Sequence, residues 1–145
     1  MKDSLKEGLS FVFAFQIPED KTVPALFPES PEFQLMPRVL ATGFLVGLIE
    51  WTCIQAVNSH LDWPNEQTVG TGVNLSHSAA TPVGLTVTVN VRLEKVEGRR
   101  LRFAVRAHDG VDEISAGFHE RHVIGADRFN RKAAEKTILK PRRKL

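Results

Sequence analysis

Apolar and polar residues alternate along two stretches of the chain. Every odd position is apolar from residue 85 to 93 and again from 101 to 107, and the positions between them are mostly polar. A two-residue period is typical of a strand that buries one face, and the pairs Glu97-Gly98 and Asp109-Gly110 are turn signals of β-hairpins. The sequence predicts strands over 9–17, 68–80, 84–96, 100–109 and 112–124, the last four forming an antiparallel meander.

The longest apolar segment, residues 42 to 59, has the length of a helix rather than a strand. Its apolar residues lie nearly all round the helical surface, which is typical of a helix buried on every side. Thr42 stands at its beginning, where a hydroxyl can cap the first turn. The expected fold class is therefore α+β, with an antiparallel five-stranded sheet wrapped around one long central helix.

Residues 18 to 37 contain five of the eight prolines of the chain. Proline at this density interrupts helix interiors and central strands. The apolar side chains among them, such as Val23, Phe33 and Met36, argue against disorder. Because loops of this length are commonly functional, we expect an ordered lid that packs over another part of the molecule.

Length and composition are those of one soluble globular domain: 145 residues, 42% hydrophobic and 25% charged. No apolar run approaches the roughly 18 to 20 residues needed to cross a membrane, and the charged N-terminus lacks the features of a signal peptide. The single cysteine, Cys53, excludes an intrachain disulfide and favours a reducing compartment. We expect a cytoplasmic protein without membrane contact, in which Cys53 is a core residue.

Positive charge is concentrated at the C-terminus. The net charge is +2, but residues 131–145 hold seven Lys/Arg and one Glu, hence +6, which leaves −4 for residues 1–130. We interpret 1–130 as the folded domain, with a short helix at 126–136, and 131–145 as a basic tail. Nucleic-acid binding by the tail is the weakest hypothesis, because the body is acidic and no aromatic platform accompanies the basic run. No nucleic-acid partner is expected.

Glu50 interrupts the apolar pattern of the predicted helix. It shares a helical ridge with Thr42, Val46 and Ile54, and none of these is charged. A buried carboxylate without a partner is costly, so either its pKa is raised or another group pairs with it. The alternative is a helix glutamate whose head reaches solvent or an arginine. Thr42 lies about 12 Å from Glu50 along the helix axis, too far for direct backbone contact.

His77 interrupts the apolar face of the next predicted strand in the same way. The two-residue period places it with Val73, Leu75 and Ala79. A lone histidine at such a position is more often a core residue than a functional one, but next to a buried glutamate it can orient a catalytic base. We therefore expect Glu50 and His77 to satisfy one another.

Gly70 and Gly72 lie at the start of the same strand, and Arg121 lies on the last one. A missing side chain allows close approach of a ligand or the helix and exposes backbone N–H groups to an oxyanion; the alternative is a β-bulge. Arg121 shares a face with His119, but the pattern assigns it no role. His119 and His122 lie on opposite faces of a strand, so no metal site is expected.

Five segments together resemble the fluoroacetyl-CoA thioesterase family of hot-dog-fold acyl-CoA hydrolases: KTVPALFPESPEF, ATGFLVGLIEW, SHSAATPVGLTVTV, VEGRRL and AHDGVDEISAGFHERHVI. The resemblance extends from the first residues to about Asn130. It implies a homodimer with the sheet around the central helix, active sites near the subunit interface, and an acyl-CoA substrate. We expect no cofactor, because CoA is part of the substrate.

The same resemblance implies roles for individual residues. The family's catalytic threonine, glutamate and histidine fall on Thr42, Glu50 and His77. Its backbone glycine contact to the thioester falls on Gly70, and a functional arginine falls on Arg121.

Within the lid we expect Val23, Phe33 and Met36 to bind substrate. The fluoroacetyl-specific enzyme of the family has a lid phenylalanine where this chain has Met36, whereas Phe33 is retained. Methionine is flexible and would close a pocket less rigidly. The sequence therefore does not assign fluoroacetate as the acyl group.

The leading hypothesis is hydrolysis of a short acyl-CoA thioester. Gly70 N–H and Thr42 would polarise the carbonyl, and Glu50, tuned by burial and His77, would activate water or attack directly. The sequence does not choose between these two routes. The alternative is a non-catalytic acyl-CoA-binding module on the same fold, which would bind CoA esters without releasing thiol.

Overall fold

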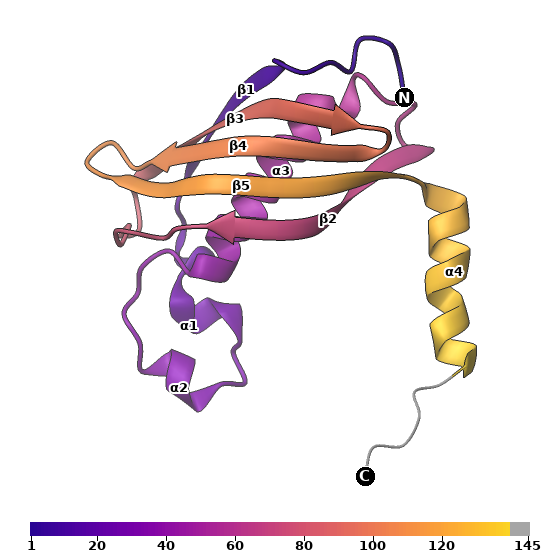
Figure 1. Cartoon of the computed structure of the whole chain (residues 1–145). Helices are drawn as coiled ribbons and strands as arrows, with labels where there is room; N and C mark the ends of the chain where they lie inside the picture. Colours follow the sequence, from indigo (N-terminus) through magenta and orange to yellow (C-terminus); the bar gives the residue numbers. More distant parts are fainter. Residues whose placement is uncertain (140–145) are drawn as a thin grey trace.

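The computed structural model describes residues 1–139 and contains a five-stranded antiparallel sheet with the strand order β1-β3-β4-β5-β2 (Figure 1). Its strands are β1 (Ser10–Gln16), β2 (Glu66–Leu75), β3 (Thr86–Glu97), β4 (Arg100–His108) and β5 (Glu113–Gly125). All five predicted strands are confirmed, with different ends. Gly98 and Gly110 have φ values of 60° and 88° in the two predicted turns, a conformation that glycine adopts without strain.

The strand order corrects the predicted four-strand meander. β3, β4 and β5 follow one another, but β2 pairs with β5 and forms an edge of the sheet. The edge of β3 that a meander would give to β2 is occupied by β1, in the register that sets Ser10 opposite Arg92. The chain between β2 and β3 therefore crosses past the beginning of the central helix, where Leu40 N donates to Thr81 O at 2.8 Å.

The helix α3 (Thr42–Asn58) lies against the inner face of the sheet (Figure 1). The odd-numbered apolar residues of β3 from 87 to 93, and those of β4 from 101 to 107, are buried, as their alternation predicts. One side of the helix stays partly open, because the sheet ends at β1. There Trp51 is 47% exposed, with its ring edge-on to Phe13 at 4.6 Å between centroids.

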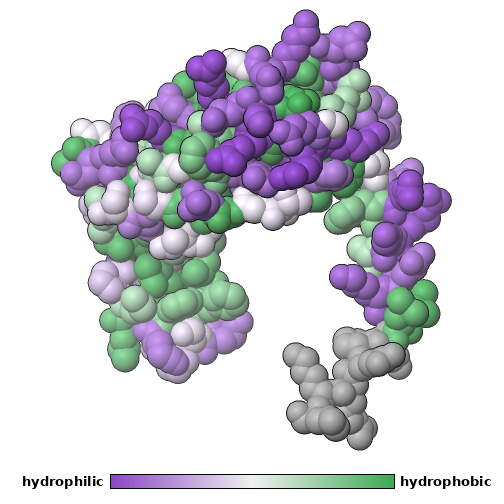
Figure 2. Space-filling model, viewed as in Figure 1, coloured by the Kyte–Doolittle hydropathy of each residue, from purple (hydrophilic) through white to green (hydrophobic). Residues whose placement is uncertain are grey.

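The proline-rich segment forms three short helices, η1 (Glu19–Lys21), α1 (Val23–Leu26) and α2 (Pro31–Gln34). Pro24 and Pro31 stand in the first turns of α1 and α2, where a missing N–H costs nothing. The prolines thus begin helices here rather than exclude them. Figure 2 shows a largely hydrophobic surface in this part of the molecule. That the proline-rich segment functions as a lid remains a prediction.

The C-terminal helix α4 (Ala126–Leu139) extends away from the sheet, and of its residues Ala126 alone is buried (Figure 1). It confirms the helix predicted at 126–136. The predicted boundary between domain and tail, after residue 130, falls inside this helix, and the basic run at 140–145 lies outside the described residues. In the part of the chain that the structure describes, no helix is long and apolar enough to span a membrane.

Candidate active site

The Glu50 side chain reaches from α3 across to β5. Its Oε2 accepts a hydrogen bond from Nη1 of Arg121 at 2.8 Å. The arginine side chain is 3% exposed and the glutamate side chain 38% exposed, so the pair stands at the border between core and surface. The carboxylate that breaks the apolar pattern therefore has a cationic partner, which is one of the two outcomes expected for it. Hydrogen bonds between two charged groups are roughly twice as strong as neutral ones.

Arg121 is held on its other side by β2. Its Nε donates to Thr68 Oγ1 and its Nη2 to Thr68 O, both at 2.8 Å. Its Nη1 also lies 3.1 Å from Nε2 of His119, two residues earlier on β5. The sequence pattern assigned Arg121 no role and therefore missed this network. The alternation of β5 contained the signal, since Ser115, His119, Arg121 and Val123 all face inward.

Gly70 lies directly opposite Arg121 in the pairing of β2 with β5. A Cβ atom placed on Gly70 would lie 2.7 Å from Oε2 of Glu50, so the carboxylate occupies the space that any side chain would need. The register also shifts between Gly70 and Gly72, which confirms the β-bulge. The predicted close approach to Gly70 is thus made by a helix side chain.

Thr42 and His77 form a second polar pair. Thr42 Oγ1 lies 2.7 Å from Nδ1 of His77. Thr42 is the first residue of α3 rather than its N-cap, which is Ala41. The predicted capping role is therefore wrong, and the hydroxyl binds the imidazole instead.

His77 lies beyond the end of β2, although the sequence predicted strand through residue 80. The chain still follows β5 there, because Ser76 N donates to Ala116 O and Ser78 N to Ile114 O. This keeps the predicted alternation, with His77 partly buried and both serines exposed.

The second ring nitrogen of His77, Nε2, is buried and has no hydrogen-bond partner among the described residues. Burial also lowers the pKa of His77, because it disfavours the charged imidazolium. A buried polar atom without a partner calls for an explanation, and a ligand or ordered water is the common one. The Thr42–His77 pair therefore offers an unused nitrogen to a bound molecule.

The two pairs correct the expectation that Glu50 and His77 satisfy one another. Glu50 is held by Arg121, and His77 by Thr42. Thr42 and Glu50 are eight residues apart on one helix, which separates them by about 12 Å along its axis. Their backbones are therefore not in contact, and a bound substrate or water must bridge the two side chains.

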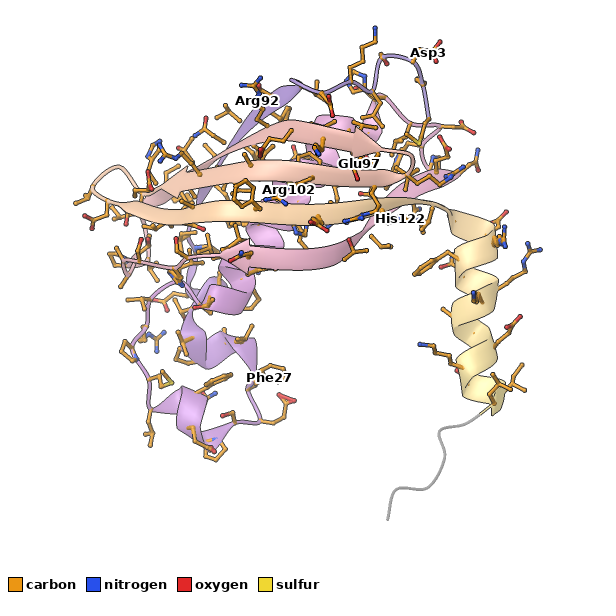
Figure 3. The ribbon with its side chains drawn as sticks, in the orientation of Figure 1. Asp3, Phe27, Arg92, Glu97, Arg102 and His122 are labelled. Atoms are coloured by element: carbon orange, nitrogen blue, oxygen red, sulfur yellow. The ribbon has the colours of Figure 1, made fainter. Side chains whose placement is uncertain are left out.

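The proline-rich segment approaches the Thr42 end of α3. A Cβ atom on Gly43 would lie 3.1 Å from Leu26 of α1, so the glycine allows this contact. Phe33 is partly buried, with its ring 6.0 Å from that of Phe27. Val23 is partly buried and its N–H donates to Val39 O, whereas Met36 is 46% exposed. Leu26 therefore brings the segment to the Thr42 end of the helix, whereas Phe33 packs on Phe27, which lies away from the sheet (Figure 3).

Cys53 is fully buried in the core, as predicted. Burial raises the pKa of its thiol to about 12, so the residue is an inert core side chain rather than a nucleophile. Within residues 1–139 no group of three or more His, Cys, Asp or Glu side chains is placed to hold a metal ion. His119 is buried and His122 is not, as expected for opposite faces of β5.

Comparison with known proteins adds an independent line of evidence. The model of the family described as fluoroacetyl-CoA-specific thioesterase matches residues 24–127. The fluoroacetyl-CoA thioesterase of Streptantibioticus cattleyicolor is 53% identical over 137 residues, which cover 94% of this chain and 98% of that protein.

Solved structures agree with this assignment. The fluoroacetyl-CoA thioesterase FlK superposes with a TM-score of 0.90 at 52% identity, over 92% of this chain and 98% of the other. A thioesterase superfamily member from Thermus thermophilus superposes with a TM-score of 0.80 at 25% identity, over 95% and 99% of the two chains. The predicted hot-dog fold is confirmed, and the chain belongs to the fluoroacetyl-CoA-specific thioesterase family.

Proposed function

We propose that this protein hydrolyses a short-chain acyl-CoA thioester to the free acid and CoA. The observation that carries the proposal is the Glu50 carboxylate, which is fixed by the buried Arg121 guanidinium and lies against a glycine rather than a side chain. Related structures support the substrate class, since variants of FlK were solved in complex with fluoroacetate and with acetyl-CoA.

Glu50 is the proposed chemical group. In one route its carboxylate accepts a proton from water while the water oxygen attacks the thioester carbonyl, and the C–S bond then breaks to release CoA thiolate. In the other route the carboxylate attacks the carbonyl itself, CoA leaves, and water hydrolyses the resulting anhydride. Single-turnover hydrolysis in oxygen-18 water separates them, because only the second route can place the label on Glu50.

Thr42 and Gly70 are proposed to polarise the thioester carbonyl. If His77 donates through Nδ1, Thr42 Oγ1 accepts that hydrogen bond and keeps its own hydroxyl hydrogen for the carbonyl oxygen. His77 then orients Thr42, while Gly70 N–H provides a second donor for the developing oxyanion. In this arrangement His77 orients Thr42, and Arg121 holds Glu50.

The acyl group is proposed to lie under the proline-rich lid, against Val23, Phe33 and Met36. The contact of the lid with α3 at Gly43, next to Thr42, supports this position for the acyl group. The chemistry requires no cofactor, because CoA belongs to the substrate.

A homodimer is proposed as the working form. β2 is an edge strand of the sheet, and its Val73 is 52% exposed. Exposed strand edges favour pairing with another copy. Sedimentation analysis should give twice the chain mass, whereas a monomer at working concentrations would exclude this form. A cytoplasmic location is proposed as well, because Cys53 is an unpaired thiol.

A free-thiol assay with a panel of short, branched, aromatic and fluorinated acyl-CoAs tests the proposed activity. We expect CoA release from at least one short acyl-CoA. A protein that binds these esters in calorimetry and releases no thiol from any of them would instead be an acyl-CoA-binding module.

A further inference from the structure

His119 is a titratable side chain in the core that the proposed reaction does not use. It lies on β5, is 1% exposed, and both of its ring nitrogens have partners. Nδ1 lies 2.8 Å from the carbonyl oxygen of Gly72 on β2, and Nε2 lies 3.1 Å from Nη1 of Arg121. The histidine therefore links the bulge of β2 to the arginine that holds Glu50.

These two contacts determine the protonation state of the ring. A carbonyl oxygen only accepts hydrogen bonds, so Nδ1 of His119 must carry a hydrogen. A guanidinium only donates, so Nε2 must be unprotonated. His119 is thus neutral, with its hydrogen on Nδ1. Burial, the largest effect, and the nearby Arg121 charge both lower the pKa of His119.

The histidine supplies the second acceptor for Nη1 of Arg121. Nη1 has two hydrogens, and its two acceptors are Glu50 Oε2 and His119 Nε2. Nε and Nη2 donate to Thr68. Without His119, one buried N–H of a charged group would lose its acceptor, and the guanidinium could rotate away from Glu50.

We propose that His119 is a positioning residue for the reaction, which acts through Arg121 to hold the Glu50 carboxylate beside Gly70. The inference rests on the proposed thioester hydrolysis for its kinetic consequences, but the protonation state of His119 follows from the fold alone. A proton on Nε2 would remove the acceptor and place a second cation against Arg121.

The other charged groups near His119 are few. Arg121 disfavours the charged ring, whereas Glu50 on α3 and Glu120 on β5 favour it. Its neighbours in the adjacent strands are uncharged, Phe103 on β4 and Val73 on β2. Burial and the charge of Arg121 therefore both oppose protonation of the His119 ring. The contact between Arg121 and Glu50 should be lost only at a pH acidic enough to protonate the ring despite both effects.

Paired variants test the kinetic role. His119→Leu removes the acceptor, whereas the amide oxygen of His119→Gln can restore it. We expect His119→Leu to lower kcat about tenfold or more while KM changes little, because the Glu50 carboxylate loses its fixed position beside Gly70. His119→Gln should recover most of the lost kcat. If both variants lose the same activity, His119 is a packing residue and the proposal is wrong.

Nitrogen-15 NMR of the histidine rings tests the same assignment without any substrate. The chain has five histidines, and the His119 signals are identified by their absence from the spectrum of His119→Gln. We expect a neutral ring protonated on Nδ1 at pH 7, which becomes charged only at a lower pH than an ordinary histidine does. A hydrogen on Nε2, or a charged ring at pH 7, would overturn the proposal even if the protein proved to be an active thioesterase.

Discussion

The two ends of the candidate site are built differently. The Glu50 end is fixed by a buried arginine with four hydrogen bonds to groups on three elements, α3, β2 and β5. The Thr42 end depends on one hydrogen bond, to a partly buried histidine beyond the end of a strand. The segment next to it carries exposed apolar residues such as Leu35 and Met36.

This difference indicates that the two ends of the site have different roles in the reaction. A charged group that takes part in bond making must keep its position, and a network of satisfied buried polar groups is rigid. The end that receives the acyl group can vary without disturbing that network. We therefore expect substitutions at the Glu50 end to change the rate for every substrate, and substitutions in the lid to change the preference among substrates.

His77→Ala should have the largest effect at the Thr42 end. Loss of the imidazole leaves the Thr42 hydroxyl without its orienting partner, so kcat/KM should fall at least a hundredfold. Thiol release by the variant gives the rate, and circular dichroism confirms that it is folded. His108→Ala, at an exposed histidine of β4, is the matched control. Near-normal turnover of His77→Ala would remove His77 from the mechanism.

Gly70→Ala tests whether the Glu50 end needs the space that the glycine provides. The new Cβ would lie 2.7 Å from Glu50 Oε2, so the flexible carboxylate must move while the backbone does not. A displacement of this size should cost about tenfold to a hundredfold in kcat, with little change in thermal stability. In Gly125→Ala the added Cβ meets nothing within 4 Å, and this variant should behave as the parent does. Unchanged kcat in Gly70→Ala would show that the close approach is not required.

The pH dependence of stability should reflect the buried histidines. The native pKa values of His77 and His119 are lowered, so the unfolded state, in which histidine has its ordinary pKa of about 6.5, binds more protons below that pH. Their contribution to stability is complete above about pH 6.5 and is lost as the pH falls towards the native values. Urea midpoints should therefore decrease from pH 7.5 to pH 5. His119→Gln should flatten this decrease, and an equal decrease in the parent and the variant would contradict this account.

Met36→Phe should have the smallest effect on rate. A rigid aromatic ring in the lid closes a pocket more tightly than methionine does. The ratio of kcat/KM for fluoroacetyl-CoA over acetyl-CoA should therefore rise by a few-fold, within the range that small changes in apolar contact allow. Leu35→Phe, at a 90% exposed position of the same segment, is the control and should not change this ratio. Equal ratios in the parent and Met36→Phe would place selectivity outside the lid.

Local patterns predicted most of the fold. The alternation in β3 and β4 and the apolar length of α3 each describe a single element, so they can be recognised in one stretch of chain. The position of β2 could not be predicted in this way. It depends on the competition between β1 and β2 for the free edge of β3, and that competition involves segments far apart in the sequence.

The candidate site shows the same limit. Glu50 and His77 were found because each breaks an apolar pattern, yet their partners were assigned incorrectly. Glu50 is 71 residues from Arg121 in the chain, and only the pairing of β2 with β5 beneath α3 brings the two together. The role of Gly70 likewise depends on a side chain from another element.

The most direct test of the central claim compares CoA release from acetyl-CoA by the unaltered chain and by Glu50→Gln. The amide keeps the size of the side chain and removes its charge, so it can neither accept a proton from water nor attack the carbonyl. We predict that kcat/KM falls at least a hundredfold, while Glu120→Gln, at a carboxylate of β5 that pairs with Arg100, retains the parent rate. Comparable rates for the parent and Glu50→Gln would contradict the assignment of this carboxylate to the chemistry.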